Sequence, residues 1–264
     1  MAPIVHLVRH AQGYHNLYTE NQKLRDPDLT KLGEKQCEDL CRLFPSHNKI
    51  THLVASPIRR TLYTCLLSFK PAVEAGKKVI ALPDAQEVSC HPCDTGLEPV
   101  VLKEEFGDKV DFHLVPDGWN DKTLGSKYYP TADNLTARAR RTRIWLRELL
   151  QEADDDAEVV LVTHGGILHF LTEDFDGVIL DHGTGWANTE HRSYKFADLT
   201  GQDSNATLVE TRASHRQRRG STVPLGETEQ MQLRVAYEAS LERELKKHAL
   251  AVAEREAKSM AKAA

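Results

Sequence analysis

An arginine and a histidine stand together at the end of a short apolar run near the start of the chain. The run at residues 4–8 (IVHLV) predicts a buried strand, and Arg9 and His10 follow it directly. Open α/β sheets bind their ligands just beyond the carboxyl ends of their strands. A guanidinium suits an anion, and a neutral imidazole suits attack on an electrophile. This dipeptide therefore predicts a site that binds an anion and attacks it.

A second histidine follows a second apolar run. Residues 159–163 (VVLVT) precede His164 and two glycines, so we expect His10 and His164 to meet at one edge of the sheet. The free N–H groups of the helix that begins after His164, and of the helix that begins after Ser56, would also favour an anion. Asn16 follows His10 closely enough to reach the same edge if its loop folds back.

A second source of positive charge lies at another junction between a strand and a helix. Residues 52–55 predict a short strand, and Ser56 with the proline after it opens a helix whose first turn holds Arg59 and Arg60. Neighbouring residues of a helix diverge by about 100°, so only one of these arginines can face the pocket comfortably. Together the two junctions predict a cage of donors around a phosphoryl group.

The elements that must position these side chains alternate along the chain. Strands separated by helices predict an α/β fold, a three-layer α/β/α arrangement with a mostly parallel central sheet. Residues 84–130 are long and punctuated by Gly and Pro, which predicts a substrate lid or insertion. We expect strands near residues 4–8, 52–55, 79–82, 159–163 and 192–196, and helices near 30–44, from 56, and near 98–106, 134–152 and 166–173.

Two histidine motifs resemble those of the histidine phosphatase superfamily, whose members have the phosphoglycerate mutase-like fold. Arg9-His10 with Asn16 resembles the Arg-His-Gly signature of that family. Residues 28–33 (DLTKLG) resemble its Leu-Thr-x-x-Gly turn, and residues 162–166 (VTHGG) resemble its second histidine motif.

Two further resemblances extend the match along the chain. Residues 56–61 (SPIRRT) are similar to the Ser-x-Leu-x-Arg-Ala helix start of the family, which selects Arg60 as the arginine of the site. The four motifs occur in family order within residues 4–200. The stretches 86–96 and 186–190 resemble a fungal-type subgroup of phosphoglycerate mutase family proteins.

The resemblance implies a metal-independent phosphatase that hydrolyses a small-molecule phosphomonoester. His10 would attack phosphorus and become a phosphohistidine, while Arg9, Arg60 and His164 stabilise the phosphoryl oxygens. Because these protein donors surround the phosphoryl group, no metal and no cofactor is expected. The predicted substrate-binding residues are Asn16, Gly13, Gly165 and Asp94.

The acid that protonates the leaving oxygen has three candidates. The family supplies a glutamate shortly after the third strand, and Glu87, the candidate that we favour, fits that place. Asp84 lies closer to the strand end, and Asp94 lies in the Asp-Thr-Gly loop of the subgroup. Two departures from the family pattern lie beside the nucleophile. Ala11 replaces the usual glycine, and Gly13 stands where a phosphate-contacting Ser or Thr is common, so one phosphate donor is expected to be missing.

Length, charge and composition exclude several classes of protein. A chain of 264 residues can bury a full core, and its net charge of −5 predicts no general attraction to nucleic acid or membranes. The sequence has no run of the ~18 apolar residues that a membrane helix needs and no signal segment, so we expect a cytoplasmic protein. Five cysteines at irregular spacing argue against a disulfide framework, and residues 90–93 (CHPC) predict reduced thiols on a loop.

Residues 1–200 are predicted to form the catalytic domain, and residues 201–264 an extension. Residues 200–226, with a basic cluster at 212–219, predict a loop or disorder. The long helix that follows either packs on the core, which we favour, or offers a surface to a homo-oligomer or another partner. The crowded arginines of residues 138–147 predict a solvated helix face rather than a nucleic-acid stripe. The long helix has an apolar stripe at Met231, Val235, Leu241, Leu245 and Val252.

Two alternatives to a phosphatase stay open. A phosphoglycerate-type mutase needs a phosphoenzyme that outlives product release, and residues 17–23 (LYTENQK) do not resemble the substrate loop of the mutases. The other alternative is a protein that keeps the phosphate pocket for binding or for non-phosphatase biosynthetic chemistry. The intact set of His10, Arg60 and His164 argues against a dead site.

Overall fold

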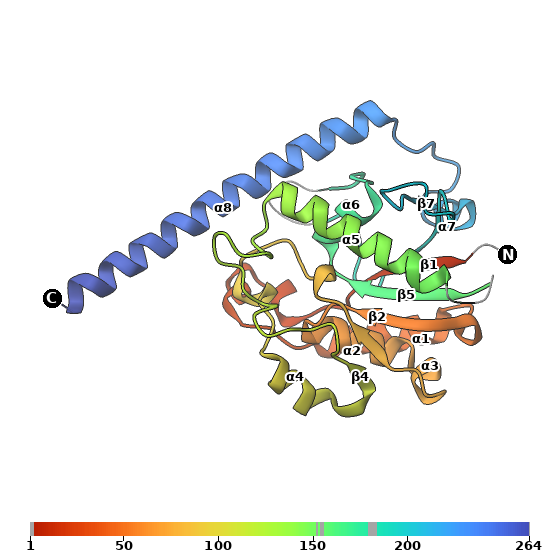
Figure 1. The fold of residues 1–264 in the computed structure, drawn as a ribbon, viewed down its shortest axis with the longest axis horizontal. Coiled ribbons are helices and arrows are strands. Elements are labelled where there is room, and N and C mark those ends of the chain that lie inside the picture. The colour runs from red at the N-terminus through yellow and green to blue at the C-terminus, as the bar shows by residue number, and fades with distance from the viewer. Residues whose placement is uncertain (1–2, 152, 154–155, 179–183, 264) are drawn as a thin grey trace.

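A computed structural model describes residues 3–151, 153, 156–178 and 184–263, and its ribbon shows one central sheet covered by helices (Figure 1). The strands are β1 Ile4–Arg9, β2 Ile50–Ala55, β3 Val79–Ala81, β4 Val110–Asp111, β5 Glu158–Thr163, β6 His191–Phe196 and β7 Leu208–Glu210. The helices are α1 Lys31–Leu43, α2 Arg59–Ser68, α3 Lys70–Glu74, α4 Pro99–Phe106, α5 Ala132–Gln151, α6 Gly165–Thr172, α7 Arg212–Arg219 and α8 Glu227–Ala263. Short 3-10 helices span Tyr14–Asn16, Thr19–Lys23, His47–Lys49, Pro83–Ala85, Pro92–Asp94 and Gly107–Lys109.

The sheet is mostly parallel, as the alternation of strands and helices predicts. Within the described residues the strand order is β4-β3-β2-β5-β1-β6-β7. Strand β1 pairs with β5, β5 with β2, β2 with β3 and β3 with β4, all in parallel. Strand β6 runs antiparallel to both β1 and β7. The carboxyl ends of β1, β2 and β5 therefore lie side by side, which brings the residues after each of them to one edge.

Apolar side chains of the central strands point alternately to two cores, one on each face of the sheet. Leu7 and Leu161 face a core that includes residues of α5, α6 and α8. Val8 and Val160 face a core that includes residues of α1, α2, α3 and α4. Figure 1 shows the corresponding helices above and below the strands. The predicted three-layer arrangement is therefore confirmed.

Only two of the five arginines at residues 138–147 of α5, Arg140 and Arg141, are exposed as their crowding predicts. Arg138, Arg143 and Arg147 are buried, with exposed fractions of 2%, 2% and 7%. Their guanidinium groups donate to backbone carbonyls, for example from Arg143 to Phe170 at 3.0 Å and from Arg138 to Gln86 at 2.5 Å. A planar fork of donors can satisfy carbonyls at chain ends and turns, so burial of these cations follows from tertiary pairing that the helical pattern does not reveal.

Residues 200–226 include a strand and a helix. They contribute β7, which pairs with β6, and α7, which includes the whole basic cluster of residues 212–219. The N-cap Thr211 accepts a hydrogen bond from the Ser214 backbone N–H at 3.2 Å. The prediction of loop or disorder was wrong because a three-residue strand and a basic helix have little apolar periodicity of their own.

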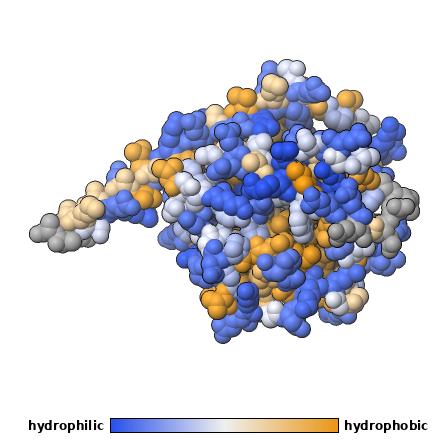
Figure 2. Space-filling model, viewed as in Figure 1, coloured by the Kyte–Doolittle hydropathy of each residue, from blue (hydrophilic) through white to orange (hydrophobic). Residues whose placement is uncertain are grey.

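The long C-terminal helix, α8, crosses the face above α5 and α6 and then projects beyond the body (Figure 1). Met231, Val235 and Val252 of the predicted apolar stripe are exposed, while Tyr237 and Leu241 are buried. The predicted stripe was wrong at Met231 and Val235 because the core-facing side of α8 lies about half a turn away. It was wrong at Val252 because residues 249–261 of α8 are exposed throughout. Figure 2 shows apolar patches along the projecting end, where Leu250 and Met260 are exposed.

The insertion at residues 84–130 is packed rather than loose. Its predicted helix is present as α4, and a short strand, β4, was not expected. Trp119 has an exposed fraction of 0%, and its indole N–H donates to the Leu97 carbonyl at 3.2 Å. A Cβ on Gly96 would lie 2.3 Å from that indole ring, which explains the glycine. All five cysteines are free, including the pair at residues 90 and 93.

No helix in the described part of the chain is long and apolar enough to cross a membrane.

Candidate active site

The two predicted histidines lie together because their strands are neighbours. His10 follows β1 and His164 follows β5, and these strands pair with Arg9 opposite Thr163. The backbone N–H of His10 continues the pairing by donating to the Thr163 carbonyl at 2.9 Å. The centres of the two imidazole rings are 5.2 Å apart. Both rings are buried at the carboxyl edge of the sheet.

Arg60, in the first turn of α2, lies between the two histidines. Its Nε donates to His10 Nε2 at 3.3 Å, and its Nη2 lies 3.0 Å from His164 Nδ1. The same Nη2 donates to Asp94 Oδ1 at 2.7 Å. Arg59 turns outward and donates to Glu105 at 2.8 Å. The helix geometry therefore brings one arginine of the pair into the site and leaves the other outside.

His10 has the protonation state that a nucleophile needs. Its Nδ1 lies 2.7 Å from the Ala11 carbonyl, which can only accept, so the ring proton is on Nδ1. Nε2 then keeps its lone pair and accepts from Arg60. Burial, and next the Arg60 charge, hold the pKa of His10 well below its ordinary value. The result is a neutral ring with an unprotonated Nε2, the form that a nucleophile requires.

His164 lies behind Arg60 rather than on the cleft surface. Because Arg60 donates to Nδ1, the proton of the neutral ring is on Nε2, which lies 2.9 Å from Ser56 Oγ. Burial, followed by the charge of Arg60, lowers the pKa of His164 well below its ordinary value. His164 therefore acts on Arg60 and His10 as a neutral, oriented ring.

Arg9 has a buried donor without a hydrogen-bond partner in the described part of the chain. Its Nη1 donates to the Trp186 carbonyl, while its Nε is buried without a hydrogen-bond partner among the described residues. His15, on the loop after β1, also has a buried nitrogen, Nδ1, without a described partner. The centres of the His15 and His10 rings are 5.3 Å apart. Two residues that line the cleft around His10 thus each have a buried polar atom without a described partner.

One of the two departures beside His10, Gly13, has a structural explanation. A Cβ on Gly13 would lie 2.8 Å from His15 Nδ1, so glycine makes room for His15. The Gly13 backbone N–H donates to Asn16 Oδ1 at 3.0 Å, which ties Asn16 to its own loop. The backbone N–H of Ala11 donates to Thr64 Oγ1 at 3.0 Å. His15, which sequence analysis left outside the predicted site, is therefore the side chain that lies where the family pattern has a hydroxyl.

The turn at residues 28–33 supports the loop after β1. Thr30 caps α1 by accepting from the Gly33 backbone N–H at 3.0 Å, and its own backbone N–H donates to the Gln12 carbonyl at 2.9 Å. A Cβ on Gly33 would lie 2.1 Å from the Gln12 carbonyl oxygen. This Thr-x-x-Gly pattern is needed because the turn packs directly on the backbone two residues beyond His10.

Glu87 lies at the first turn of α6, inside the cleft. Its carboxylate accepts from the backbone N–H groups of Gly166 and Ile167, both at 3.1 Å, and from Val88 at 2.9 Å. Burial raises the pKa of Glu87, and the nearby charge of Asp94 raises it further, against these three donors. Among the three acid candidates, Glu87 is the cleft carboxyl whose pKa is raised.

Of the other two candidates, Asp94 lies in an environment that favours its charged form, and Asp84 lies outside the cleft. Asp94 lines the cleft but pairs with Arg60, and although burial opposes ionisation, that guanidinium and Lys122 lower its pKa to about 2. Asp84 is on the outer side of α5, where it pairs with Arg141 at 2.8 Å. It is not among the residues that line the cleft.

Both helix N-termini that were expected to be free for a bound anion are occupied by carboxylates of the protein. Glu87 fills that of α6, and Asp26 Oδ1 accepts from the Arg59 backbone N–H at the start of α2, at 2.9 Å. The expectation was wrong because these N–H groups are buried and must find partners within the fold. The sites remain anion sites, but the anions are side chains.

The cleft around His10 has a volume of about 460 Å³. Of the predicted site residues, His164, Gly13 and Gly165 do not line it, and Gly165 packs against Thr184, whose Cγ2 would lie 2.2 Å from an added Cβ. Its lining includes the predicted residues Arg9, His10, Asn16, Arg60, Glu87 and Asp94, and in addition His15, Thr19, Gln22, Val88, Ser89, His91, Cys93, Gly166, Thr184, Tyr237, Ser240, Leu241 and Glu244.

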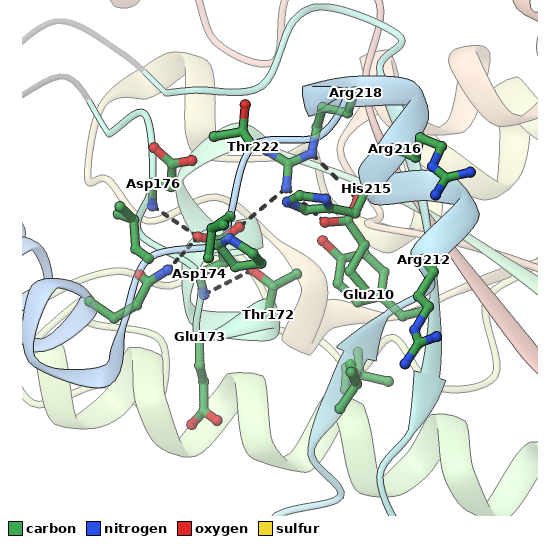
Figure 3. Close-up of a pocket in the computed structure, with 18 of the residues that line it drawn as sticks. Thr172, Glu173, Asp174, Asp176, Glu210, Arg212, His215, Arg216, Arg218 and Thr222 are labelled. Atoms are coloured by element: carbon green, nitrogen blue, oxygen red, sulfur yellow. Dashed lines mark hydrogen bonds and ion pairs between the residues drawn. The ribbon is translucent and has the colours of Figure 1, made fainter.

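A larger hollow, of about 710 Å³, lies between the end of α6, the edge strands and α7 (Figure 3). Its central charges are already paired. Arg218 donates to Glu210 at 2.7 Å and lies 3.6 Å from Asp174. Figure 3 shows Arg212 and Arg216 turned away from this centre. The hollow lies apart from His10, so size does not identify the chemical site in this protein.

A buried neutral imidazole, an arginine beside it and a carboxyl in the same cleft lie at the edge of an α/β sheet, and these are groups that phosphoryl chemistry uses. A sequence model described as histidine phosphatase superfamily (branch 1) matches residues 5–212. The chain therefore belongs to the histidine phosphatase superfamily, as its motifs indicate.

Curated relatives and solved structures agree with this family. Phosphoglycerate mutase-like protein 1 of Arabidopsis thaliana is 29% identical over 248 residues, covering 77% of this chain and 85% of that protein. Phosphoglycerate mutase-like protein of the same plant is 26% identical over 209 residues, covering 65% and 74%. The ecdysone phosphate phosphatase of Bombix mori has the same fold, with a TM-score of 0.52 and 18% identity over 73% of this chain and 89% of that one.

Proposed function

We propose that this protein is a phosphatase that hydrolyses a small-molecule phosphomonoester through a phosphohistidine on His10. The observation that carries the proposal is the state of His10, a neutral ring whose Nε2 keeps its lone pair beside Arg60 in an open cleft. Phosphoryl transfer to histidine requires a nucleophile of this kind with a cation beside it. We expect the arginines to take the place of a metal ion.

In the first step, Nε2 of His10 forms a bond to phosphorus as the bond to the leaving oxygen breaks. Arg9 and Arg60 balance the charge on the phosphoryl oxygens, and His15 lines the same cleft. Glu87, whose pKa is raised by burial, gives its proton to the leaving oxygen. The alcohol leaves, and the enzyme holds a phosphohistidine.

In the second step, a water molecule attacks phosphorus on the side that the alcohol has left. The Glu87 carboxylate, held by three backbone N–H groups, takes a proton from this water. The bond from phosphorus to His10 breaks, and inorganic phosphate is released. One carboxyl thus serves as acid and then as base, which restores the starting state.

The proposal is tested with an aryl phosphate in the presence of EDTA. The wild type should release phosphate, and His10→Ala should lose about 10³-fold or more of kcat because the nucleophile is gone. Intact-protein mass spectrometry after an alkaline quench should detect a phosphorylated species in the wild type only.

The matched control is His113→Ala, which removes an exposed histidine that pairs with Asp111 far from the cleft. It should keep wild-type activity. Hydrolysis that survives the loss of His10, or that requires an added metal ion, would contradict the mechanism. Transfer of the phosphoryl group to a second substrate without release of phosphate would favour the mutase alternative.

A further inference from the structure

One wall of the His10 cleft comes from outside the part of the chain that the family model matches. Tyr237, Ser240, Leu241 and Glu244 line the cleft, and all four belong to α8, whereas the match ends at residue 212. Their spacing of three, four and seven residues places them on one face of the helix. The extension therefore contributes directly to the space that a substrate would occupy.

Specific contacts hold α8 against the cleft. Gln230 Oε1 accepts from the Phe175 backbone N–H, and Arg234 Nη2 donates to Thr136 Oγ1, both at 2.8 Å. The Tyr237 ring packs against the Phe175 ring, with centres 6.1 Å apart, and only 7% of Tyr237 is exposed. These contacts join α8 to α5 and to the end of α6, so the wall is part of the folded domain.

The wall approaches the proposed acid. A Cβ on Gly166 would lie 2.6 Å from Glu87 Oε1 and 3.0 Å from the Tyr237 hydroxyl oxygen, so that hydroxyl and the carboxyl are near neighbours. Burial raises the pKa of Tyr237, and Glu87 adds to the effect, so the hydroxyl stays neutral. The leaving group, which must reach Glu87, therefore lies along the face that Tyr237 and Leu241 provide.

The charges around the cleft limit what that leaving group can carry. Among the described lining residues, the permanent cations are Arg9 and Arg60, and Asp94 already pairs with Arg60. A phosphomonoester dianion brings two negative charges to these two arginines. Glu244, which adds a negative charge to the wall, has no arginine or lysine beside it in the described lining. A second anionic group on the substrate would meet a carboxylate and no permanent cation.

We propose that α8 selects phosphomonoesters of alcohols that carry no second anionic group, with Glu244 as the residue that determines this preference. Alcohols that carry an amine gain an ion pair with Glu244, neutral alcohols are accepted, and carboxylate-bearing alcohols are rejected. This inference rests on the proposed phosphatase function and names the substrate class of the same cleft.

The test compares two substrates of nearly equal size, glycerol 3-phosphate and 3-phosphoglycerate, which differ in a hydroxymethyl group against a carboxylate. We expect kcat/KM of the wild type to be about 10-fold higher for glycerol 3-phosphate, the size of effect expected for one nearby like charge. Glu244→Gln should narrow this ratio, and Glu244→Lys should reverse it. O-phosphoethanolamine should be the best of the three for the wild type and should lose most in Glu244→Lys.

The matched control is Glu242→Lys, the same charge change on the same helix. Glu242 is exposed and pairs with Lys246 at 2.9 Å, so its variant should keep the wild-type ratio. A wild-type preference for 3-phosphoglycerate, or an unchanged ratio in Glu244→Lys while aryl phosphate is still hydrolysed, would overturn this inference alone. Failure of the wild type to hydrolyse aryl phosphate would instead contradict the proposed function, and this inference with it.

Discussion

Two hollows of this molecule differ in size and in how their charges are paired. The hollow beside α7 holds about 710 Å³ and the cleft around His10 about 460 Å³, and each contains an arginine that is largely removed from water. Arg218, in the larger hollow, pairs with two carboxylates, Glu210 and Asp174. Arg60, in the smaller cleft, pairs with one carboxylate and faces two neutral histidines.

The difference lies in which groups the fold gathers. Around Arg218 the charges compensate one another, so this cluster serves stability, although the buried Tyr194 hydroxyl in the same hollow also lacks a described partner. Around Arg60 the fold gathers a neutral imidazole, two polar atoms that lack partners within the described residues, Arg9 Nε and His15 Nδ1, and a carboxyl whose pKa is raised. This combination, rather than volume or a single unsatisfied atom, marks the place where chemistry is expected.

The sharpest way to break this comparison is to remove each arginine. Arg60→Gln should lower kcat/KM for phosphomonoesters by about 10³-fold, because it removes the group that stabilises the phosphoryl oxygens. Arg218→Gln should leave kcat/KM unchanged and cost about 1 kcal/mol of the free energy of unfolding, since its ion pairs are partly exposed. Steady-state kinetics and urea unfolding of both variants measure the two effects.

Arg60→Lys separates a loss of activity from a loss of folding, because it keeps a positive charge opposite Asp94. It should fold like the wild type and still lose most of the activity, since an ammonium cannot contact both histidines and Asp94 at once. Full activity in Arg60→Lys would show that charge alone suffices and that the fork geometry is irrelevant.

A smaller effect is expected at Glu87. Glu87→Gln should lower kcat/KM for alkyl phosphates by about 10²-fold, and much less for aryl phosphates, whose leaving group needs no proton. The wild type should lose kcat/KM for alkyl phosphates as pH rises through the raised pKa of Glu87, since only the protonated form is an acid. The loss with rising pH should vanish in Glu87→Gln.

Asp84→Asn is the matched control and decides between the acid candidates. Asp84 pairs with Arg141 outside the cleft, so this variant should keep both the rate and the pH profile of the wild type. If the loss of kcat/KM at high pH disappears in Asp84→Asn or in Asp94→Asn and persists in Glu87→Gln, that aspartate, and not Glu87, is the acid.

The smallest effect is expected at Lys122, a buried cation behind the cleft. Lys122 Nζ donates to the carbonyls of Glu87 at 3.1 Å and Ser89 at 2.8 Å, and burial lowers its pKa to about 8. Lys122→Met should lower kcat about 5- to 10-fold with little change in KM, because the Glu87 backbone loses a support. It should also move the alkaline limb to higher pH, since a nearby positive charge is lost.

Lys127→Met provides the control for that variant. Lys127 belongs to the same insertion, and its side chain is 62% exposed near Asp84, so its removal should change neither kcat nor the pH profile. A loss of stability in Lys122→Met without any movement of the pH limb would show that Lys122 supports the fold and does not position the acid.

Much of the fold could be predicted because the apolar runs are strong local signals. The strands at 4–9 and 158–163 and the helix at 99–106 lie where the pattern places them. The failures share one cause. The buried arginines of α5, the short strand β7 and the core-facing side of α8 all depend on partners that are remote in sequence, and a local pattern carries no information about them.

The candidate site divides in the same way. The motifs name His10, Arg60 and His164, and the order of strand and helix explains why such residues would meet. Neither motif nor spacing indicates that Gly13 makes room for His15, or that Glu87 closes the N-terminus of α6. The contribution of Tyr237 and Glu244 lies beyond the family match and depends on where α8 packs.

By itself, the sequence determined which residues can do chemistry and that they follow strands, because residue type and apolar periodicity are properties of the chain alone. Only the tertiary structure decided the protonation state of His10, the separation in pKa between Glu87 and Asp94, and the wall that α8 adds. Each of these depends on burial and on the charges nearby, which exist only when distant segments of the chain are packed together.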